Sequence, residues 1–383
     1  MTEYSAPGVY VEELPRRPKP IAGARTDVAA FVGPTVTGAE RDGLPTLVRS
    51  LAEFERTFGG AEDLRGDAGR TPNYMAHSAR AYFENGGARL YIVRTSRIAC
   101  LVDYTTALQR LREVAEVSIV AAPGYSTQNN AAALQQALID HVEDASSQHV
   151  YQFAVLDSAP QASPAELESE RADLETSRAA LYYPWIKAGA PGDAVELSLP
   201  PSGYVRGIYA RVARERGVWK APANERVRGA LALQQDLDAP TQQHLNALGI
   251  NCIRHFPGRG VLVWGARTLS GDPEWKYVSV RRLCMFLEQS LYEGLQWAAC
   301  EANGPMLWER VCQCVDEFLM GEWRGGALQG ATPREAFFVR CDRSTMTRAD
   351  LQAGRLICEV GVAPVKPAEF VIFRLSLITG TDE

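Results

Sequence analysis

The hydrophobic positions in the last third of the chain follow a helical period twice in succession. From Val278 onward the apolar residues recur at steps of three and four, which predicts an amphipathic helix running to Asn303. Gly304 and Pro305 end that pattern, and a second helix is predicted from Leu307 to Gly321. Two successive apolar faces require a common core. The apolar face of the first helix consists of Val280, Leu283, Cys284, Leu287, Leu291, Leu295 and Ala298.

Two strand-like segments close the chain. Arg355–Val362 is the first, and from Val371 to Leu377 apolar and polar residues alternate with the period of a strand. The link between them, residues 363–367, contains two prolines, which lack the N–H groups that a tight hairpin uses. We therefore expect the last strand to pair elsewhere than with the strand before it.

The first segment of the chain has a similar character. Val9, Tyr10 and Val11 form a short strand-like run, and three prolines follow within residues 15–20. Such a link is extended and semi-rigid, so the strand has no local partner. A single strand is unstable in water and must add to the edge of another sheet. The pattern alone leaves open whether that sheet belongs to the same subunit or to a neighbour.

Between these ends, strands and helices alternate. Residues 26–100 are interpreted as a compact mixed unit, with a strand at Val28–Val32 and a helix that has Pro72 in its first turn. From residue 117 to residue 264, short unbroken apolar strands alternate with helices, which predicts a parallel sheet covered on both faces. The expected strands there include Val117–Ala121, Tyr151–Leu156 and Leu181–Tyr183.

Composition narrows the classes of partner. The 383 residues are enough for two or three domains, and 46% hydrophobic with 22% charged residues is typical of a globular protein. A net charge of −6 argues against nucleic acid as the main partner. No apolar run has the length of a membrane span, and the first residues lack the pattern of a signal peptide. We expect that the protein is made in the cytoplasm and does not insert into a membrane.

Candidate catalytic chemistry is sparse. A serine-protease triad needs a nucleophile, a histidine base and a carboxylate. His149 and His255 lie beside predicted strands, but neither has the flanking pattern of a catalytic histidine. Asp157 follows a central strand, where α/β folds often place chemistry, yet a lone carboxylate there is more commonly a helix cap or turn ligand. We expect no catalytic site and no cofactor.

The cysteines and one basic helix are two further candidates for a binding site. The eight cysteines contain no CxxC pair, and Cys312 and Cys314 should face different sides of a helix, so we interpret them as reduced core residues and expect no metal site. The predicted helix Tyr204–Arg216 is basic and could bind an anion, but a solvated face is the preferred interpretation. Its arginines are Arg206, Arg211, Arg214 and Arg216.

Four segments carry a resemblance to a known family. Val261–Leu269, Asp272–Leu283, Glu335–Asp342 and Gly354–Leu375 resemble, in order, the conserved core of the contractile tail sheath family, which includes sheaths of phages, R-type pyocins and phage-tail-like injection systems. The resemblance implies an α/β and α+β protein. It would have a subtilisin-like doubly wound core, a C-terminal α+β sheath domain and extended strand arms at both termini.

The resemblance also implies a domain order. Residues 1–25 would be the N-terminal arm and linker, 26–100 an N-terminal α/β part, 101–264 the subtilisin-like domain, and 265–383 the C-terminal sheath domain with its terminal strand arm. The length, short for the family, favours the injection-system branch.

The function implied is structural. Subunits would polymerise helically around an inner tube and contract to drive it through a target envelope, with no enzymatic activity. The implied partners are other sheath subunits, the tube protein, the baseplate and a tail terminator. Assembly would occur in the bacterial cytoplasm, before any release of the particle. Trp323 and Arg324 are candidates for contact with the tube. Residues implied in strand exchange between subunits are Val9, Tyr10, Val11, Ile357, Glu359, Phe370, Val371, Ile372, Phe373 and Leu375.

Two alternatives from other classes remain at this point. A hydrolase using the subtilisin-like fold would react with a serine-directed probe. A plain oligomeric binding module would form small closed oligomers and not long tubes.

Overall fold

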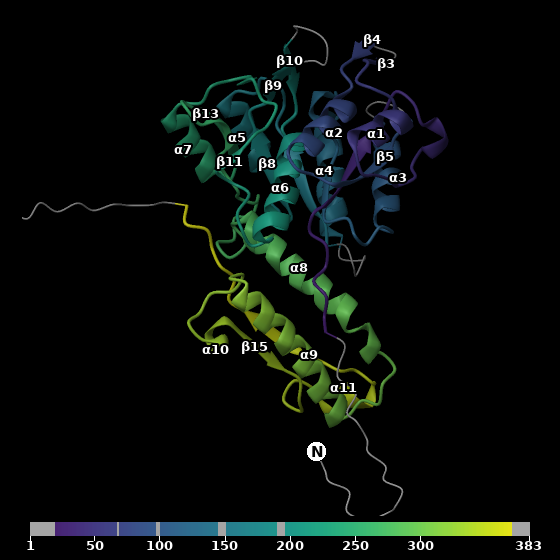
Figure 1. Ribbon diagram of the computed structural model, residues 1–383, viewed down its shortest axis with the longest axis vertical. Helices are drawn as coiled ribbons and strands as arrows, with labels where there is room; N and C mark the ends of the chain where they lie inside the picture. Colours follow the sequence, from purple (N-terminus) through teal and green to yellow (C-terminus); the bar gives the residue numbers. More distant parts are fainter. Residues whose placement is uncertain (1–19, 67–68, 97–99, 145–150, 190–195, 370–383) are drawn as a thin grey trace, which may run out of the picture.

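The computed structural model describes residues 20–66, 69–96, 100–144, 151–189 and 196–369. These residues form two bodies, and a single helix, α8 (Val278–Gly294), runs from one to the other (Figure 1). We call the larger one, up to residue 277, the sheet body, and the smaller one, residues 295–365, the C-terminal body.

The sheet body is built on nine strands. Its six central strands are parallel, and antiparallel strands complete both edges. From one edge to the other they are β11 (Glu225–Arg226), β14 (Gly260–Val263), β13 (Asn251–Phe256), β8 (Ala179–Tyr183), β7 (Phe153–Asp157), β6 (Ile119–Ala121), β1 (Val28–Gly33), β5 (Arg89–Arg94) and β2 (Thr46–Val48).

Helices cover both faces of this sheet. Val28, Ala30 and Val32 of β1 face one core, while Ala29 and Phe31 face another. That alternation follows from the period of a strand, and it explains why the central strands contain almost no polar residues. Four helices lie on the first face: α3 (Leu101–Leu111), α4 (Ala131–Glu143), α5 (Pro164–Ala172) and α7 (Ala239–Ala247). On the other lie α1 (Leu51–Phe58), α2 (Tyr74–Glu84) and α6 (Ser202–Arg216).

Smaller elements decorate the sheet body. They are the hairpin of β3 (Leu64–Gly66) and β4 (Gly69–Thr71), the small sheet of β9 (Ile186–Gly189), β10 (Glu196–Leu199) and β12 (Ala232–Leu233), and the 3₁₀ turns η1 (Ala39–Arg41) and η2 (Tyr125–Thr127).

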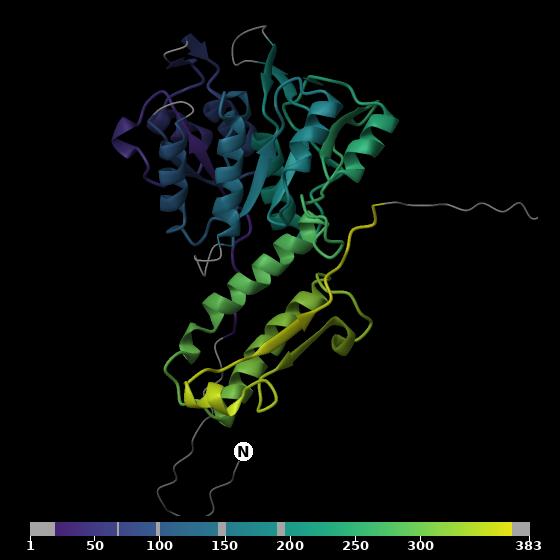
Figure 2. The same ribbon diagram turned by 180° about the vertical axis from the view of Figure 1, so that it is seen from behind.

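The C-terminal body is a helix with a two-stranded sheet packed on it. Helix α9 (Pro305–Arg324) lies beneath β15 (Phe337–Arg340) and β16 (Glu359–Val362), which pair antiparallel (Figure 2). The core between them includes Trp308, Val315 and Phe318. The remaining elements are η3 (Gln296–Ala298), α10 (Pro333–Ala336) and α11 (Arg348–Gln352).

Helix α8 belongs to the cores of both bodies. Val278 and Met285 are buried with the sheet body, whereas Leu283 and Leu287 are buried with the C-terminal body. Between these positions, the guanidinium of Arg282 lies 4.9 Å from the ring centroid of Tyr209 and donates a hydrogen bond of 2.6 Å to the carbonyl oxygen of Thr26. These contacts fix α8 against the sheet body at its N-terminal half.

The length predicted for this helix was wrong. It ends at Gly294, and a 3₁₀ turn replaces the expected last turns. Gly294 lies so close to Ile21 that a Cβ atom there would come within 2.7 Å of the Ile21 side chain. Glycine is a poor helix former, and here the close approach of the N-terminal segment requires it.

Other predicted boundaries were also wrong. Helix α2 begins at Tyr74 and not at Pro72, because the Asn73 side chain caps it by accepting a hydrogen bond from the backbone N–H of Ala76. Strand β16 begins at Glu359 and not at Arg355, whose side chain instead bonds to Asp350.

The preferred interpretation of the basic helix holds for only half of its arginines. Arg214 and Arg216 of α6 are exposed, but Arg206 and Arg211 are buried. Arg206 donates to the Ala30 carbonyl at 2.7 Å, and burial lowers its pKa to about 9. The helical pattern cannot distinguish a face that meets water from a face that meets a sheet.

Asp157 caps α6, as the sequence favoured. Its side chain is buried and accepts hydrogen bonds of 2.7 Å from both the backbone N–H and the hydroxyl of Ser202, the first residue of that helix. Burial raises the pKa of Asp157 to about 7, against the weaker lowering effects of Ser202 and Arg206.

A first prediction concerns this carboxyl group. The folded protein keeps the Asp157 proton up to a pKa of about 7, whereas the unfolded chain loses it near 3.8, so this group lowers the free energy of unfolding as pH rises between these values. Asp157→Asn keeps an acceptor for Ser202 and does not titrate. We expect its stability relative to wild type to rise between pH 4 and pH 8, by at most about 4 kcal/mol.

Urea midpoints of the two proteins at several pH values measure this difference. Taking the difference removes the contribution of His141, whose pKa is lowered by burial to about 4 and which acts in the opposite direction over a similar range. A difference that does not change with pH would contradict the assignment.

A second prediction concerns α8. Truncating Leu287, which is 5% exposed, removes apolar contacts in the core shared with α9, so Leu287→Ala should lower the free energy of unfolding by about 2–5 kcal/mol. Glu288→Ala changes an exposed neighbour on the same helix and should stay within about 0.5 kcal/mol. Equal denaturant midpoints for these two variants would show that α8 is not anchored in that core.

Candidate functional site

The two ends of the described chain are fastened to the molecule at separate places. At the N-terminal end, residues 21–26 lie along α8: Ile21 is buried, and the backbone N–H of Ala24 donates to the hydroxyl of Ser290 at 2.9 Å. The carbonyl of Thr26 accepts from Arg282, as described above. Residues 21–26 therefore run from the C-terminal body, where Ile21 is buried, to the sheet body, where β1 begins.

At the C-terminal end, a single carboxylate is held by four side chains, a group we call the Glu369 clamp. Arg267 donates from Nε to Oε1 at 2.8 Å and from Nη2 to Oε2 at 2.7 Å. Asn246 donates to Oε1 at 3.1 Å and Tyr277 to Oε2 at 3.2 Å, and the Lys276 ammonium lies 3.6 Å from Oε2. A two-bonded arginine pair combines charge with fixed geometry.

The clamp is electrostatically consistent with an ionised glutamate. Partial burial would raise the pKa of Glu369, but hydrogen bonds from Arg267 and Asn246 and the nearby positive charges lower it below its ordinary value. Pro367 precedes the clamp and restricts the backbone. The chain therefore leaves the described structure at a defined point on the sheet body.

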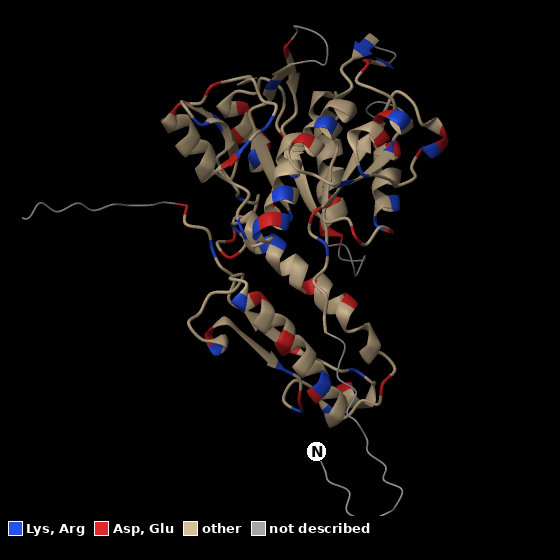
Figure 3. Cartoon of the chain, in the orientation of Figure 1, with Lys and Arg blue, Asp and Glu red and all other residues tan. Residues whose placement is uncertain are grey.

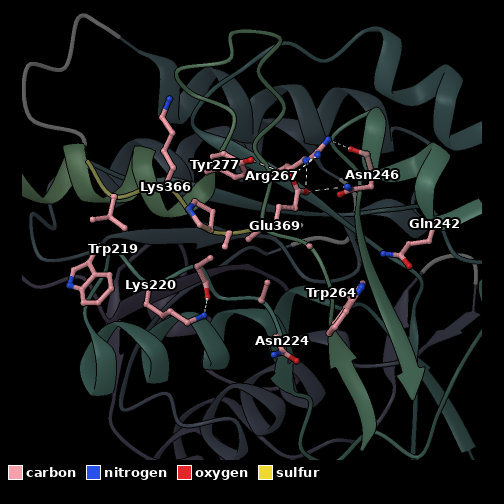
Figure 4. Close-up of a pocket in the computed structure, with 17 residues that line it drawn as sticks. Trp219, Lys220, Asn224, Gln242, Asn246, Trp264, Arg267, Tyr277, Lys366 and Glu369 are labelled. Carbon is pink, nitrogen blue, oxygen red and sulfur yellow. Dashed lines mark hydrogen bonds and ion pairs between the residues drawn. The ribbon is translucent and has the colours of Figure 1, made fainter. Parts of the chain in front are cut away.

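The clamp forms one wall of a hollow. Figure 4 shows Glu369, Arg267, Asn246 and Tyr277 pointing toward one another on one side, with Trp219 and Trp264 on other sides. The hollow measures about 730 Å³ and is lined by three stretches of chain, residues 219–224, 264–267 and 365–369, with Gln242, Asn246 and Tyr277.

The two-stranded sheet of the C-terminal body offers open edges. Among the described residues, no further strand pairs with β15 or β16. Ala363 donates its N–H to Ala336 at 2.8 Å, so these two residues form a hydrogen-bonded pair, and every second residue along β16 faces β15 in the same way. The backbone groups of Val360 and Val362 therefore point to the open side. Such an edge can accept a further strand.

A close contact strengthens the pairing of the two strands. Phe338 lies opposite Gly361, and a Cβ atom at position 361 would come within 2.1 Å of its ring. The phenyl ring thus lies across the glycine, on the face of the sheet away from α9. This ring remains 52% exposed.

The residues implied in strand exchange fall partly outside the described structure. Ile357 and Glu359 are described: the carbonyl of Ile357 accepts from the Thr345 hydroxyl at 2.8 Å, and Glu359 is paired with Arg340 across the sheet. Outside the described residues lie Val9, Tyr10, Val11, Phe370, Val371, Ile372, Phe373 and Leu375.

Trp323 and Arg324, the two candidates for contact with a tube, are the last residues of α9. Trp323 packs against the core of the C-terminal body and donates its indole N–H to the Gly330 carbonyl at 3.1 Å, while Arg324 is exposed. The second helix was predicted to end at Gly321, but α9 continues to Arg324, so both residues belong to the helix.

Of the residues considered for catalysis, the two that the structure describes, Asp157 and His255, do not come together. Asp157 is bonded to Ser202, and His255 is exposed on β13. His149 lies outside the described residues. All eight cysteines are free thiols; three are buried and one, Cys300, is exposed.

Over the described ranges, no group of His, Cys, Asp or Glu could hold a metal ion, and no helix there is long and apolar enough to cross a bilayer. Figure 3 shows basic and acidic residues interspersed on both bodies.

Sequence reasoning missed the clamp. Arg267 and Glu369 are 102 residues apart, and no local spacing relates them. The one available signal was the link with two prolines at residues 363–367, since a stiff link needs a fixed support.

Two protein-family models match this chain. A model of the phage tail sheath protein central domain matches residues 102–269, and a model of the phage tail sheath C-terminal domain matches residues 270–378. A putative prophage major tail sheath protein of Pseudomonas aeruginosa is 23% identical over 267 residues, which cover 69% of this chain and 65% of the relative. The chain thus spans less than two thirds of this curated relative.

Solved structures match along nearly the whole chain. The helical sheath of the anti-feeding prophage in the contracted state has a TM-score of 0.81 at 32% identity, covering 97% of this chain and 99% of the other. The contracted sheath of the extracellular contractile injection system PVC has a TM-score of 0.79 at 29% identity, covering 98% of both. A sheath tail protein of Listeria innocua, at 10% identity and a TM-score of 0.61 over 91% of this chain and 96% of the other, shares the fold. Because the two family models together match well over half of its residues, the chain belongs to the phage tail sheath family.

Proposed function

We propose that this protein is the structural subunit of a contractile sheath, which polymerises helically around an inner tube and shortens to drive the tube through a target envelope. One observation carries the proposal. The chain resembles a contracted helical sheath over 97% of its length and 99% of the other chain. The likeness to extracellular injection systems favours a phage-tail-like particle that is released from the cell that assembles it.

Strand exchange would connect the subunits. The arm containing Val9–Val11 and the arm containing Phe370–Leu375 would add to the open edges of β15 and β16 in neighbouring subunits, beside Ile357 and Glu359. The open edges and the separate anchors of the two terminal segments support this proposal. Each backbone hydrogen bond made to an added strand would contribute about 0.5–1.5 kcal/mol.

The mechanism needs no catalytic group. Rigid subunits would rotate between two packings, and the stored energy would be the free-energy difference between these packings summed over the cylinder. We also propose that the sheet body is related to the subtilisin-like fold without its activity, since Asp157 is committed to Ser202. Trp323 and Arg324 remain our candidates for contact with the tube. We propose that the baseplate and a tail terminator bind the two ends of the sheath.

A third prediction tests polymerisation. Deleting residues 2–13 removes the N-terminal arm but leaves Ile21 and the contacts along α8. We expect a soluble, cooperatively melting protein that forms no cylinders in negative-stain electron microscopy, whereas the full chain forms long hollow cylinders. Normal cylinders from the truncated chain would refute arm exchange. Insoluble, unfolded protein would place the strand in its own subunit.

A fourth prediction tests the Glu369 clamp. Glu369→Ala removes a partly buried carboxylate with hydrogen bonds worth about 1.5–3 kcal/mol, so amide exchange of residues 365–369 should quicken by roughly tenfold to a hundredfold. The matched control is Lys366→Ala, which changes an exposed residue of the same segment and should leave exchange unchanged.

Acidification should act in the same direction. Since the pKa of Glu369 is lowered in the folded protein, the clamp stabilises the fold above the ordinary carboxylate range and weakens as pH falls below it. Hydrogen exchange followed by mass spectrometry measures both effects. Equal exchange in Glu369→Ala and Lys366→Ala would mean that the clamp does not hold the segment.

A further inference from the structure

Three of the free cysteines meet in the C-terminal body. Cys341 follows β15, Cys358 precedes β16, and Cys312 lies on α9 beneath them. All three belong to, or pack against, the same hydrophobic core, where Cys341 is 6% exposed and the other two are half-buried. Positions 312, 341 and 358 form no recognisable motif spacing, so nothing in the local sequence relates them.

The strand register places two of these cysteines directly opposite each other. Arg340 of β15 pairs with Glu359 of β16, so the next residues in the same antiparallel register are Cys341 and Cys358. Side chains of opposed residues lie on one face of a sheet. Here it is the face toward α9, because Val339 and Val360, two pairs back along the sheet and therefore on the same face, pack against the same core.

The type of pair is favourable for a disulfide. Ala336 and Ala363 form a hydrogen-bonded pair, and hydrogen-bonded pairs recur at every second position. Arg340 and Glu359 are therefore hydrogen-bonded, and Cys341 and Cys358 occupy a non-hydrogen-bonded site. Opposed Cα atoms at such sites are about 4.5 Å apart, within the range of about 4.4–6.8 Å that a disulfide spans.

The two thiols lie near each other in the same core. Each influences the pKa of the other, and each also interacts with the Cys312 thiol. Burial raises the pKa of Cys341 to about 11 and that of Cys358 to about 12, so both are protonated thiols at neutral pH. Thiols of this kind react slowly and stay reduced where small disulfides are scarce.

The segment that a bond would close is folded in advance. Residues 342–357 contain α11, whose first turn is closed by mutual hydrogen bonds between Thr347 and Asp350. Arg355 bonds to Asp350 at 2.8 Å, and the Thr345 hydroxyl bonds to the Ile357 carbonyl. These bonds fold residues 342–357 into a closed loop that connects the two cysteines.

We propose that Cys341 and Cys358 form a site of reversible oxidation, becoming a cross-strand disulfide when the protein meets a low-molecular-weight disulfide such as oxidised glutathione. The thiolate of the half-buried Cys358 attacks one sulfur of the small disulfide and expels one small thiolate. The thiolate of Cys341 then attacks the sulfur of Cys358 and expels the second. Two protein thiols are oxidised, the small disulfide is reduced to two thiols, and these take up the two protons.

The bond would tie the end of the two-stranded sheet. It would hold β15 and β16 in register without occupying either open edge, and it would stabilise the C-terminal body by restricting its unfolded chain. The inference concerns the isolated subunit and does not depend on the proposed sheath function.

The test uses the full-length protein at pH 8 with oxidised glutathione, followed by alkylation of free thiols and mapping of non-reduced peptides by mass spectrometry. We expect a Cys341–Cys358 link that dithiothreitol reverses, and a melting temperature about 5 °C higher in the oxidised protein. Cys312→Ser should still form the link, as should Cys252→Ser, which changes a buried cysteine on β13. Cys358→Ser should lose both the link and the rise in melting temperature.

Several results would overturn the proposal. A dominant link from Cys312 to either partner in the wild-type protein would show that the strand register does not control the pairing. A Cys341–Cys358 link that is no more abundant at equilibrium in the folded protein than in urea would show that the fold does not favour the pair. A link formed without any rise in melting temperature would remove the stabilising role. The wild-type protein and Cys312→Ser answer these points even if Cys358→Ser does not fold.

Discussion

The burial of one helix in two cores constrains the rest of this molecule. Met285 of α8 packs in the sheet body and Leu287, half a turn further on, packs in the C-terminal body. Protein cores are close-packed, so the helix cannot tilt against one body without opening contacts in it. Arg282, fixed over Tyr209, adds a polar constraint at the same place. Helix α8 therefore holds the two bodies in one arrangement, as the proposed rotation of rigid subunits requires.

The architecture of the sheet body could largely be predicted from local patterns. Strands buried on both faces read as unbroken apolar runs, which is why Tyr151–Leu156 and Leu181–Tyr183 predicted a parallel sheet. The strand predicted at Val28–Val32 was assigned to a separate unit, but the structure places it in this same sheet. Local patterns could not give the strand order, in which β1 lies between β5 and β6. The burial of Arg206 could not be predicted either, because the same helical spacing fits a face turned toward water and a face turned toward Phe31.

At the Glu369 clamp and the cysteine pair, too, the local sequence predicted only part of what the structure shows. Pro364 and Pro367 predicted that the last segment does not form a hairpin with the strand before it. They did not predict that Glu369, just after these prolines, is held by Arg267. Residues so far apart in the chain meet only when the whole sheet has formed. Cys341 and Cys358 are nearer in sequence, yet their opposition depends on the register of β15 and β16, which a one-residue slip would abolish.

That register has a geometric consequence for any strand that joins the open edge of β16. Only alternate residues, Val360 and Val362 among them, turn their backbone groups outward, and an added strand must keep its own apolar face toward α9. Its allowed positions are therefore spaced two residues apart, roughly 7 Å along the edge. A strand added at this edge would therefore not slide gradually along β16 under tension. It would hold one register under tension until its hydrogen bonds break.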